Sequence, residues 1–179
     1  MAKRILFIVL TTFICLQASA QMVAVKTDVL KDVAMIPNAS VELVVGERHT
    51  MGLQLFGAVN PWGQDVSILG VTPSFRYWLS GRTMSRLFVG ANAQLINYDI
   101  KWNKDVYQGN AVALGVSLGY AFNLSKRLNI EVEGGSEIMA YSQKEFRKGD
   151  YHPLYGEKAN AHGTILFPRL EVSVVYVIR

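Results

Sequence analysis

The residues best suited to chemistry lie between positions 142 and 163. They are His152 and His162, with Ser142, Asp150 and Glu157 close by in the chain. A histidine beside a serine or an acid can act as base and nucleophile, and some small membrane barrels modify lipid with such a set. No spacing here fixes the mutual geometry of these side chains. The two histidines also lack the spacing of metal ligands. The sequence therefore predicts exposed loop residues, with no catalytic residue, metal site or cofactor.

A basic and aromatic stretch from Asp99 to Asn110 offers a second kind of contact. It carries Trp102 and Tyr107 beside lysines, a combination that can touch sugar or lipid headgroups, although an interfacial anchor has the same composition. We therefore predict recognition, if any, in outer loops. The candidate residues are Trp102, Tyr107, His152 and His162.

A third set consists of charged residues spaced along segments that are otherwise apolar. Its members are Lys26, Asp28, Glu42, Arg76, Glu131, Glu133, Glu137, Arg169 and Glu171. If they share one interior they must pair or be hydrated, and we expect a packed polar plug rather than an open pore. The first and last segments would be neighbours across a closing seam. We therefore expect Lys26 and Asp28 to pair with Arg169 and Glu171.

The elements that must position these charges alternate with period two, as strands do. From Ala111 to Phe122 one face is large and apolar while the other holds only Ala, Ser and Gly. In the next segment, which starts at Leu128, apolar residues alternate with Asn129, Glu131, Glu133 and Glu137. Large apolar residues outside, with small or charged residues inside, are typical of a transmembrane β-barrel.

Eight such segments can be marked, each close to the length of a tilted membrane strand. They are 22–30, 38–45, 50–59, 68–79, 87–98, 111–122, 128–141 and 164–178. We predict an all-β fold, an eight-stranded antiparallel up-and-down transmembrane β-barrel. Short connections alternate with longer ones, including loops at 99–110 and 142–163, as expected for periplasmic turns and outer loops. Pro73 and Pro168 predict a bulge or a strand end, since proline cannot donate to a ladder.

The beginning of the chain predicts export. Lys3 and Arg4 precede an apolar run that ends in Ala18-Ser19-Ala20, the pattern of a cleaved signal peptide. We therefore assign residues 1–20 to the signal peptide and 21–179 to a single barrel domain. Cys15, the only cysteine, lies within the signal, so the remaining chain has no thiol chemistry. The net charge of +4 is too small to indicate a nucleic-acid partner.

A secreted, soluble barrel of the lipocalin type is the main alternative, because it too has eight alternating strands. Its interior holds only its own side chains or one small ligand. About forty large apolar side chains on these faces would not fit there, so most must point outward, into lipid. Aromatic residues near the segment ends are expected to form interfacial girdles. They are Tyr77, Trp78, Tyr98, Tyr120, Phe122 and Tyr176.

Several motifs resemble an uncharacterised domain family of Bacteroides-type bacteria, a domain of unknown function. The matching stretches are Ala24 to Leu30, Pro37-Asn38, Asn60-Pro61-Trp62, Arg76 to Leu79, Tyr107 to Gly109 and Leu124 to Glu131. The resemblance covers nearly all of the chain after the signal. It implies an exported protein with a small outer-membrane-type barrel, and a link to surface-fimbria genes. It implies no activity and no site residues.

Together these patterns predict a small outer-membrane β-barrel protein of structural or surface-interaction type, without catalysis. The resemblance adds a link to fimbria or adhesion assembly. The expected partners are outer-membrane lipid and surface or fimbrial proteins. Two alternatives remain open at this point. One is an outer-membrane lipid-modifying enzyme that uses the histidines, and the other is a lipocalin-like ligand-binding barrel.

Overall fold

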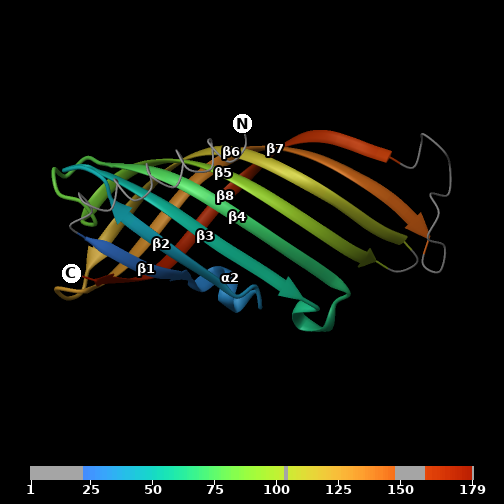
Figure 1. Cartoon of the computed structure of the whole chain (residues 1–179), viewed down its shortest axis with the longest axis horizontal. Coiled ribbons are helices and arrows are strands. Elements are labelled where there is room, and N and C mark those ends of the chain that lie inside the picture. The colour runs from blue at the N-terminus through green and yellow to red at the C-terminus, as the bar shows by residue number, and fades with distance from the viewer. Residues whose placement is uncertain (1–21, 103–104, 148–159, 179) are drawn as a thin grey trace, which may run out of the picture.

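Eight strands make up most of the described residues. The computed structural model describes residues 22–102, 105–147 and 160–178, without the side chains of 102, 105, 145–147 and 160. The strands are β1 (Val23–Asp28), β2 (Asn38–Val44), β3 (His49–Val59), β4 (Val66–Trp78), β5 (Arg86–Trp102), β6 (Asp105–Asn123), β7 (Leu128–Arg147) and β8 (Asn160–Ile178) (Figure 1). The helical elements are α2 (Val29–Val33) and the 3-10 turn η1 (Pro61–Gly63). The predicted all-β class and eight strands are confirmed.

The strands form one closed antiparallel sheet. Each pairs with its neighbours in sequence order, and β1 pairs with β8 to complete the ring. The closing seam is short, running from Val23 opposite Ile178 to Asp28 opposite Ser173. Because every connection joins adjacent antiparallel strands, side chains at alternate positions face either the interior or the exterior all the way round.

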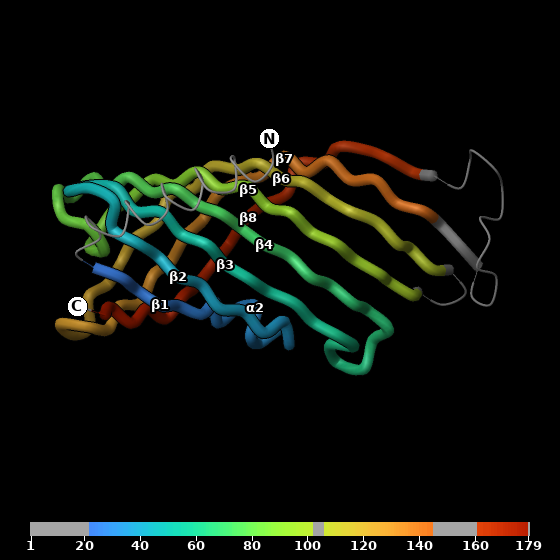
Figure 2. Tube along the Cα trace, viewed as in Figure 1, coloured from blue at the N-terminus to red at the C-terminus, as the bar shows by residue number. Residues whose placement is uncertain are grey.

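The strands on one side of the ring are much longer than those on the other. β5 to β8 have 17 to 20 residues, whereas β1 to β4 have 6 to 13. The tube view shows β5 to β8 running on past the ends of β1 and α2 (Figure 2). The predicted loop at 99–110 is wrong, since β5 and β6 stay paired as far as Trp102 opposite Asp105. The backbone ladder continues there although the side-chain pattern changes.

The chain turns from β1 into α2, where the sequence predicted a strand up to Leu30. The side chain of Asp28 accepts a hydrogen bond from the backbone N–H of Leu30 at 3.1 Å, which makes Asp28 the N-cap of α2. No helix in the described part of the chain combines the length and the apolar character that a membrane-spanning helix requires.

Both prolines lie inside strands, so the predicted bulges or strand ends are wrong. Pro73 stays in register with Leu53 of β3, although the ladder to β5 is interrupted between Val71 and Ser74. Pro168 pairs with Ser136 of β7, and its other side lies beyond the reach of β1, whose pairing stops at Ser173. A strand edge without a partner does not need the N–H that proline lacks.

The exterior is apolar and the interior is charged over most of the ring. Outward positions of β6 run from Val112 through Leu114, Val116 and Leu118 to Phe122, and all are exposed. The interior holds most of the buried polar side chains, including Glu42, Glu131 and Glu137 at 1 to 2 % exposure. This is the reverse of a water-soluble sheet, which buries its apolar face.

Candidate functional site: a charged interior

The nine charges singled out in the sequence all lie on the inner face. β1 supplies Lys26 and Asp28, β2 Glu42, β4 Arg76, β7 the three glutamates, and β8 Arg169 and Glu171. Eight of them are buried as whole residues, and the side chain of Arg169 is 8 % exposed. Neighbouring strands leave room for three of them, because Gly52 lies opposite Glu42, Gly90 opposite Arg76 and Gly115 opposite Glu137.

Arg76 lies at the centre of one cluster. Its Nη1 is 2.9 Å from Glu42 Oε2 and 2.8 Å from Glu131 Oε2, and its Nη2 pairs with Glu133. Lys26 Nζ adds a second cation, 2.7 Å from Glu42 Oε2 and 3.6 Å from Glu131 Oε2. Buried carboxylates of this kind are tolerable only with close cationic partners.

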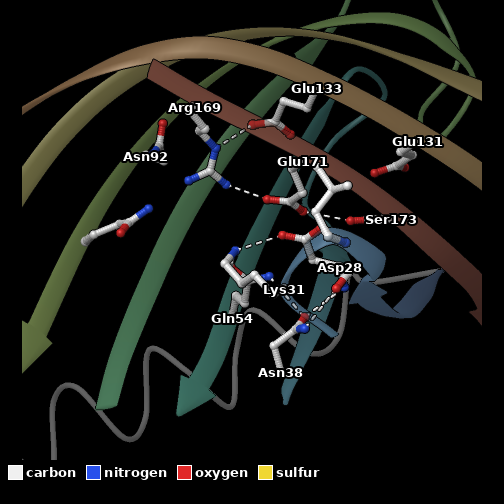
Figure 3. Close-up of polar contacts among 12 residues, drawn as sticks. Asp28, Lys31, Asn38, Gln54, Asn92, Glu131, Glu133, Arg169, Glu171 and Ser173 are labelled. Atoms are coloured by element: carbon white, nitrogen blue, oxygen red, sulfur yellow. Dashed lines mark hydrogen bonds and ion pairs between the residues drawn. The ribbon is translucent and has the colours of Figure 1, made fainter. Parts of the chain in front are cut away.

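Arg169 holds a second cluster, joined to the first through Glu133. Its guanidinium lies 2.6 Å from Glu171 Oε2 and 3.3 Å from Glu133 Oε1 (Figure 3). It also lies 2.8 Å from Glu137 Oε1. Glu137 also accepts hydrogen bonds from Asn92 and Gln94 of β5. The two arginines thus share Glu133, and the ion pairs join β2, β4, β7 and β8 into one network.

A third group surrounds Asp28 where β1 turns into α2. Lys31 Nζ lies 3.0 Å from Asp28 Oδ2 and donates to Gln54 Oε1 at 2.9 Å (Figure 3). The side chain of Asn38 accepts from the backbone N–H of Asp28 and donates back to its carbonyl. The sequence analysis missed Lys31 because it placed this residue in a connection. The spacing of Asp28 and Lys31, three apart with Asp28 as a cap, could have indicated the pair.

The predicted ion pairs across the closing seam are not among the close contacts, although Lys26 and Glu171 are near enough to interact electrostatically. Asp28 lies opposite Ser173 and Lys26 opposite Val175, so neither faces Arg169 or Glu171 directly. Lys26 reaches Glu42 on the neighbouring strand and Glu131 across the interior instead. Side chains from opposite walls meet in so narrow a ring, and cross-strand register alone does not predict their partners.

An apolar plug fills the end of the interior at the short turns. Trp78 and Phe88 pack with ring centroids 4.7 Å apart, and Met84 from the turn between β4 and β5 packs into the same cluster. Trp78 donates from Nε1 to Thr50 Oγ1 at 3.0 Å. The prediction that Trp78 is an interfacial anchor is therefore wrong, since its side chain is fully buried in the interior. The guanidinium of Arg76 lies over Phe88, 4.5 Å from the ring centre, and joins the plug to the ion pairs.

The four residues predicted for recognition in outer loops do not form a cluster like that of the interior charges. Tyr107 and His162 lie within β6 and β8, not in loops, with Tyr107 on the inner face and His162 exposed on the outer face. Trp102 ends β5 opposite Asp105, and its side chain lies outside the described part. His152 also falls outside the described residues. These four are not brought together into one described site.

Ser142 and His162 are nevertheless opposite each other on β7 and β8. Both are exposed on the outer face, and their cross-strand neighbour on β6 is Asn110. A nucleophile needs a hydrogen-bonded base and a group that orients that base. Here the amide of Asn110 lies beside Ser142 and not beside His162. These three residues therefore lack the order of a catalytic triad, in which the orienting group lies beside the histidine. Within the described residues, no three His, Cys, Asp or Glu side chains are grouped so as to hold a metal ion.

Comparison with known proteins gives one match. A family model described as a protein of unknown function, DUF3575, matches residues 5–178. No curated protein and no solved structure matches the chain. Because the family model covers almost the whole sequence, the closed sheet and its buried ion pairs are features of a member of that family. The chain belongs to the DUF3575 family of proteins of unknown function.

Proposed function

We propose that this protein is a small outer-membrane β-barrel that conducts no ions, acts through its outer surface and catalyses no reaction. The observation that carries the proposal is the polarity of the ring. Most outward positions along β3 to β8 are apolar and many are large, whereas the interior holds ten charged side chains if Lys31 is counted with the predicted nine. A protein folded for water would expose the charges and bury the apolar face.

The height of the apolar exterior supports a membrane location. From Val112 to Phe122 the outward face of β6 is uninterrupted. That stretch rises ~34 Å along the strand and ~26 Å along the barrel axis at a tilt of about 40°. The apolar band of an outer-membrane barrel is about 25 Å tall. One bilayer core would therefore cover this band.

A polar row marks the upper limit of the band. Asn97, Asn110, Ser142 and His162 are successive cross-strand neighbours on the outer face of β5 to β8. Directly beyond this row the outward positions are polar, with Asp99 and Gln108 hydrogen-bonded to each other and Lys144 next to Gln108, although Val106 follows one pair further on. The strands that continue past the row would stand in water on the outer side. This extension is where surface or fimbrial proteins would make contact.

The filling of the interior supports a plugged barrel rather than an open pore. Each of the six interior carboxylates has a cation within 4 Å, and the short-turn end is filled by Trp78, Phe88 and Met84. An eight-stranded barrel has room for little more than its own side chains. We therefore expect the reconstituted protein to conduct no measurable ion current. The soluble ligand-binding alternative would need an apolar lining where these charges lie.

The test is the electrophoretic mobility of detergent-extracted membranes with and without boiling, together with gradient separation of inner and outer membranes. A closed barrel resists cold detergent because its strand edges are paired. The unboiled protein should therefore migrate faster and sediment with the outer membrane. A protein found in the soluble fraction, with no shift on boiling, would overturn the proposal.

A further inference from the structure

The inner face changes character above the ion pairs. Beyond Arg169, the next inward positions of β8 are Phe167 and Ile165, which are 50 % and 45 % exposed. On β7, Glu137 of the charged cluster lies opposite Phe167, whereas Met139 lies opposite Ile165 and Tyr141 is the next inward residue; Met139 and Tyr141 are only partly buried. The same face continues on the shorter side of the ring with Ile96 and Phe56, which meet across Gly70. The upper interior is therefore apolar where the middle is charged.

Small, buried residues of β6 line the wall beside these side chains. Ala113 lies opposite Met139, and Ala111 lies between Tyr141 and Ile96. Tyr98 lies against Gly109, where an added Cβ would come within 2.7 Å of the tyrosine oxygen. Its hydroxyl is 3.0 Å from Oε1 of Gln143. The apolar inner face thus continues over the buried alanines of β6 and is bordered above by tyrosine hydroxyls.

The wall beside this face lacks a strand. Among the described residues, β8 has a partner on the β1 side only from Ser173 to Ile178. The next contact on that side is the N–H of Val172, 3.4 Å from Asp28 Oδ1 at the start of α2. Alternate N–H groups point the same way, so residue 168 would also aim its donor at this open edge. Pro168 has none, which leaves one fewer unsatisfied donor there.

The open edge is apolar on both sides of the sheet. Leu166 and Leu170 face outward and are 72 % and 65 % exposed, while Ile165 and Phe167 face inward. The polar row that ends the outer apolar band crosses β8 at His162, so all four lie at the depth of that band. The lipid-facing exterior is therefore continuous with the upper interior around the edge of β8.

We propose that the hydrocarbon chain of a membrane lipid passes the edge of β8 between Gly163 and Leu170 and lies against this upper inner face. The proposal rests on the membrane location proposed above. A hydrocarbon chain needs no hydrogen bond from the edge, whereas an added peptide strand would require the donor that Pro168 lacks. The ion pair of Arg169 with Glu137 forms a charged floor that stops the chain. The accessible inner face from residue 161 to 167 spans ~16 Å along the axis.

The test uses the full chain refolded into phosphatidylcholine vesicles that contain a few mole per cent of phosphatidylcholine with a diazirine near the end of one acyl chain. After irradiation, labelled residues are identified by mass spectrometry. We expect label on inward residues Met139, Ile165 or Phe167, in addition to outward residues such as Leu114. Met139→Trp fills the inner face, so it should reduce the inner label at least five-fold. Its matched control, Ile138→Trp, lies on the opposite face of β7 and should leave the inner label unchanged.

The outcomes separate this inference from the proposed membrane location. Label confined to outward residues of a protein that still migrates faster when unboiled would overturn the lipid site and leave the barrel intact. An inner label that persists in Met139→Trp would also overturn it, because the chain would then not lie where the inference puts it. Lack of label on both faces, with no shift on boiling, would mean that the membrane proposal itself had failed. If Met139→Trp does not fold, Ile165→Trp with Leu166→Trp as its control provides the same comparison.

Discussion

The strongest prediction concerns Arg76, which lies among three carboxylates. Replacing it with methionine keeps most of the side-chain length but leaves Glu42, Glu131 and Glu133 with one cation fewer. Removing one partner of a buried ion pair costs about 3–5 kcal/mol. Lys26 and Arg169 still lie near these glutamates. We therefore expect a loss of about 3 kcal/mol in the free energy of unfolding, which is a factor of roughly 100 in the folded-to-unfolded ratio.

The assay is urea unfolding of the protein in phospholipid vesicles, followed by the fraction that migrates as the fast, unboiled form. The free energy is obtained by linear extrapolation, with the slope m checked for each variant. Arg82→Met is the matched control, because Arg82 is exposed in the turn between β4 and β5. It should change the free energy by less than about 0.5 kcal/mol.

Adding a second substitution, Glu131→Gln, tests whether the loss of stability comes from an uncompensated carboxylate. After Arg76→Met, Glu131 is the carboxylate with the poorest compensation, since its other cation, Lys26, is 3.6 Å away. Adding Glu131→Gln removes that uncompensated charge and should recover at least half of the lost stability. The reasoning is refuted if Arg76→Met lies within about 1 kcal/mol of the parent, or if the double variant is less stable than the single one. Either result would mean that water already compensates these charges.

Two further predictions use features outside the ion pairs. Gly119→Ala should lower the free energy of unfolding by about 1–3 kcal/mol, because its new methyl group would meet the ring of Phe88; in the same urea assay Gly134→Ala, with open space at its Cβ, should cost less than half as much, and equal costs would count against the packing argument. Ser142→Ala and His162→Ala should each leave the phospholipid and lipid A profile of the membrane unchanged by mass spectrometry, because the row they share lacks a triad's order. A changed profile in either variant would revive the lipid-modifying enzyme.

Alternation alone predicted the eight strands and the inward direction of the nine charges. It worked because a closed sheet imposes the same two-residue period on every strand, whatever the tertiary partners are. The upper ends of β5 to β8 were not predicted as strands, because there the apolar residues point inward and the polar residues point outward. Tyr98 and Ile100 point inward while Asn97 and Asp99 point outward. The pattern of apolar residues on the outer face therefore ends at Asn97, although the backbone pairing of β5 with β6 continues to Trp102.

The contacts between opposite walls could not be predicted in the same way. Trp78 is an aromatic residue near a strand end, as an interfacial anchor would be. It follows Arg76 by two positions on β4, however, so its side chain points to the same inner face. The alternation along β4 indicates an inward Trp78, whereas its aromatic type favours the interface. The reach of Lys26 to Glu131 depends on the width of the ring and on side-chain length. Neither quantity is encoded in the spacing along a single strand.

The brevity of the seam has a consequence for the order in which the ring forms. β6 and β7 are joined by a short turn and pair along 19 positions, whereas β1 and β8 pair along six, between residues at opposite ends of the chain. Contacts between distant residues carry the larger loop-closure cost and are made late in folding. We expect the long hairpins to assemble first and the seam to close last. In hydrogen exchange, the amides of β1 should therefore exchange faster than those of β6. Unfolding would then begin at the β1–β8 seam, where folding ends.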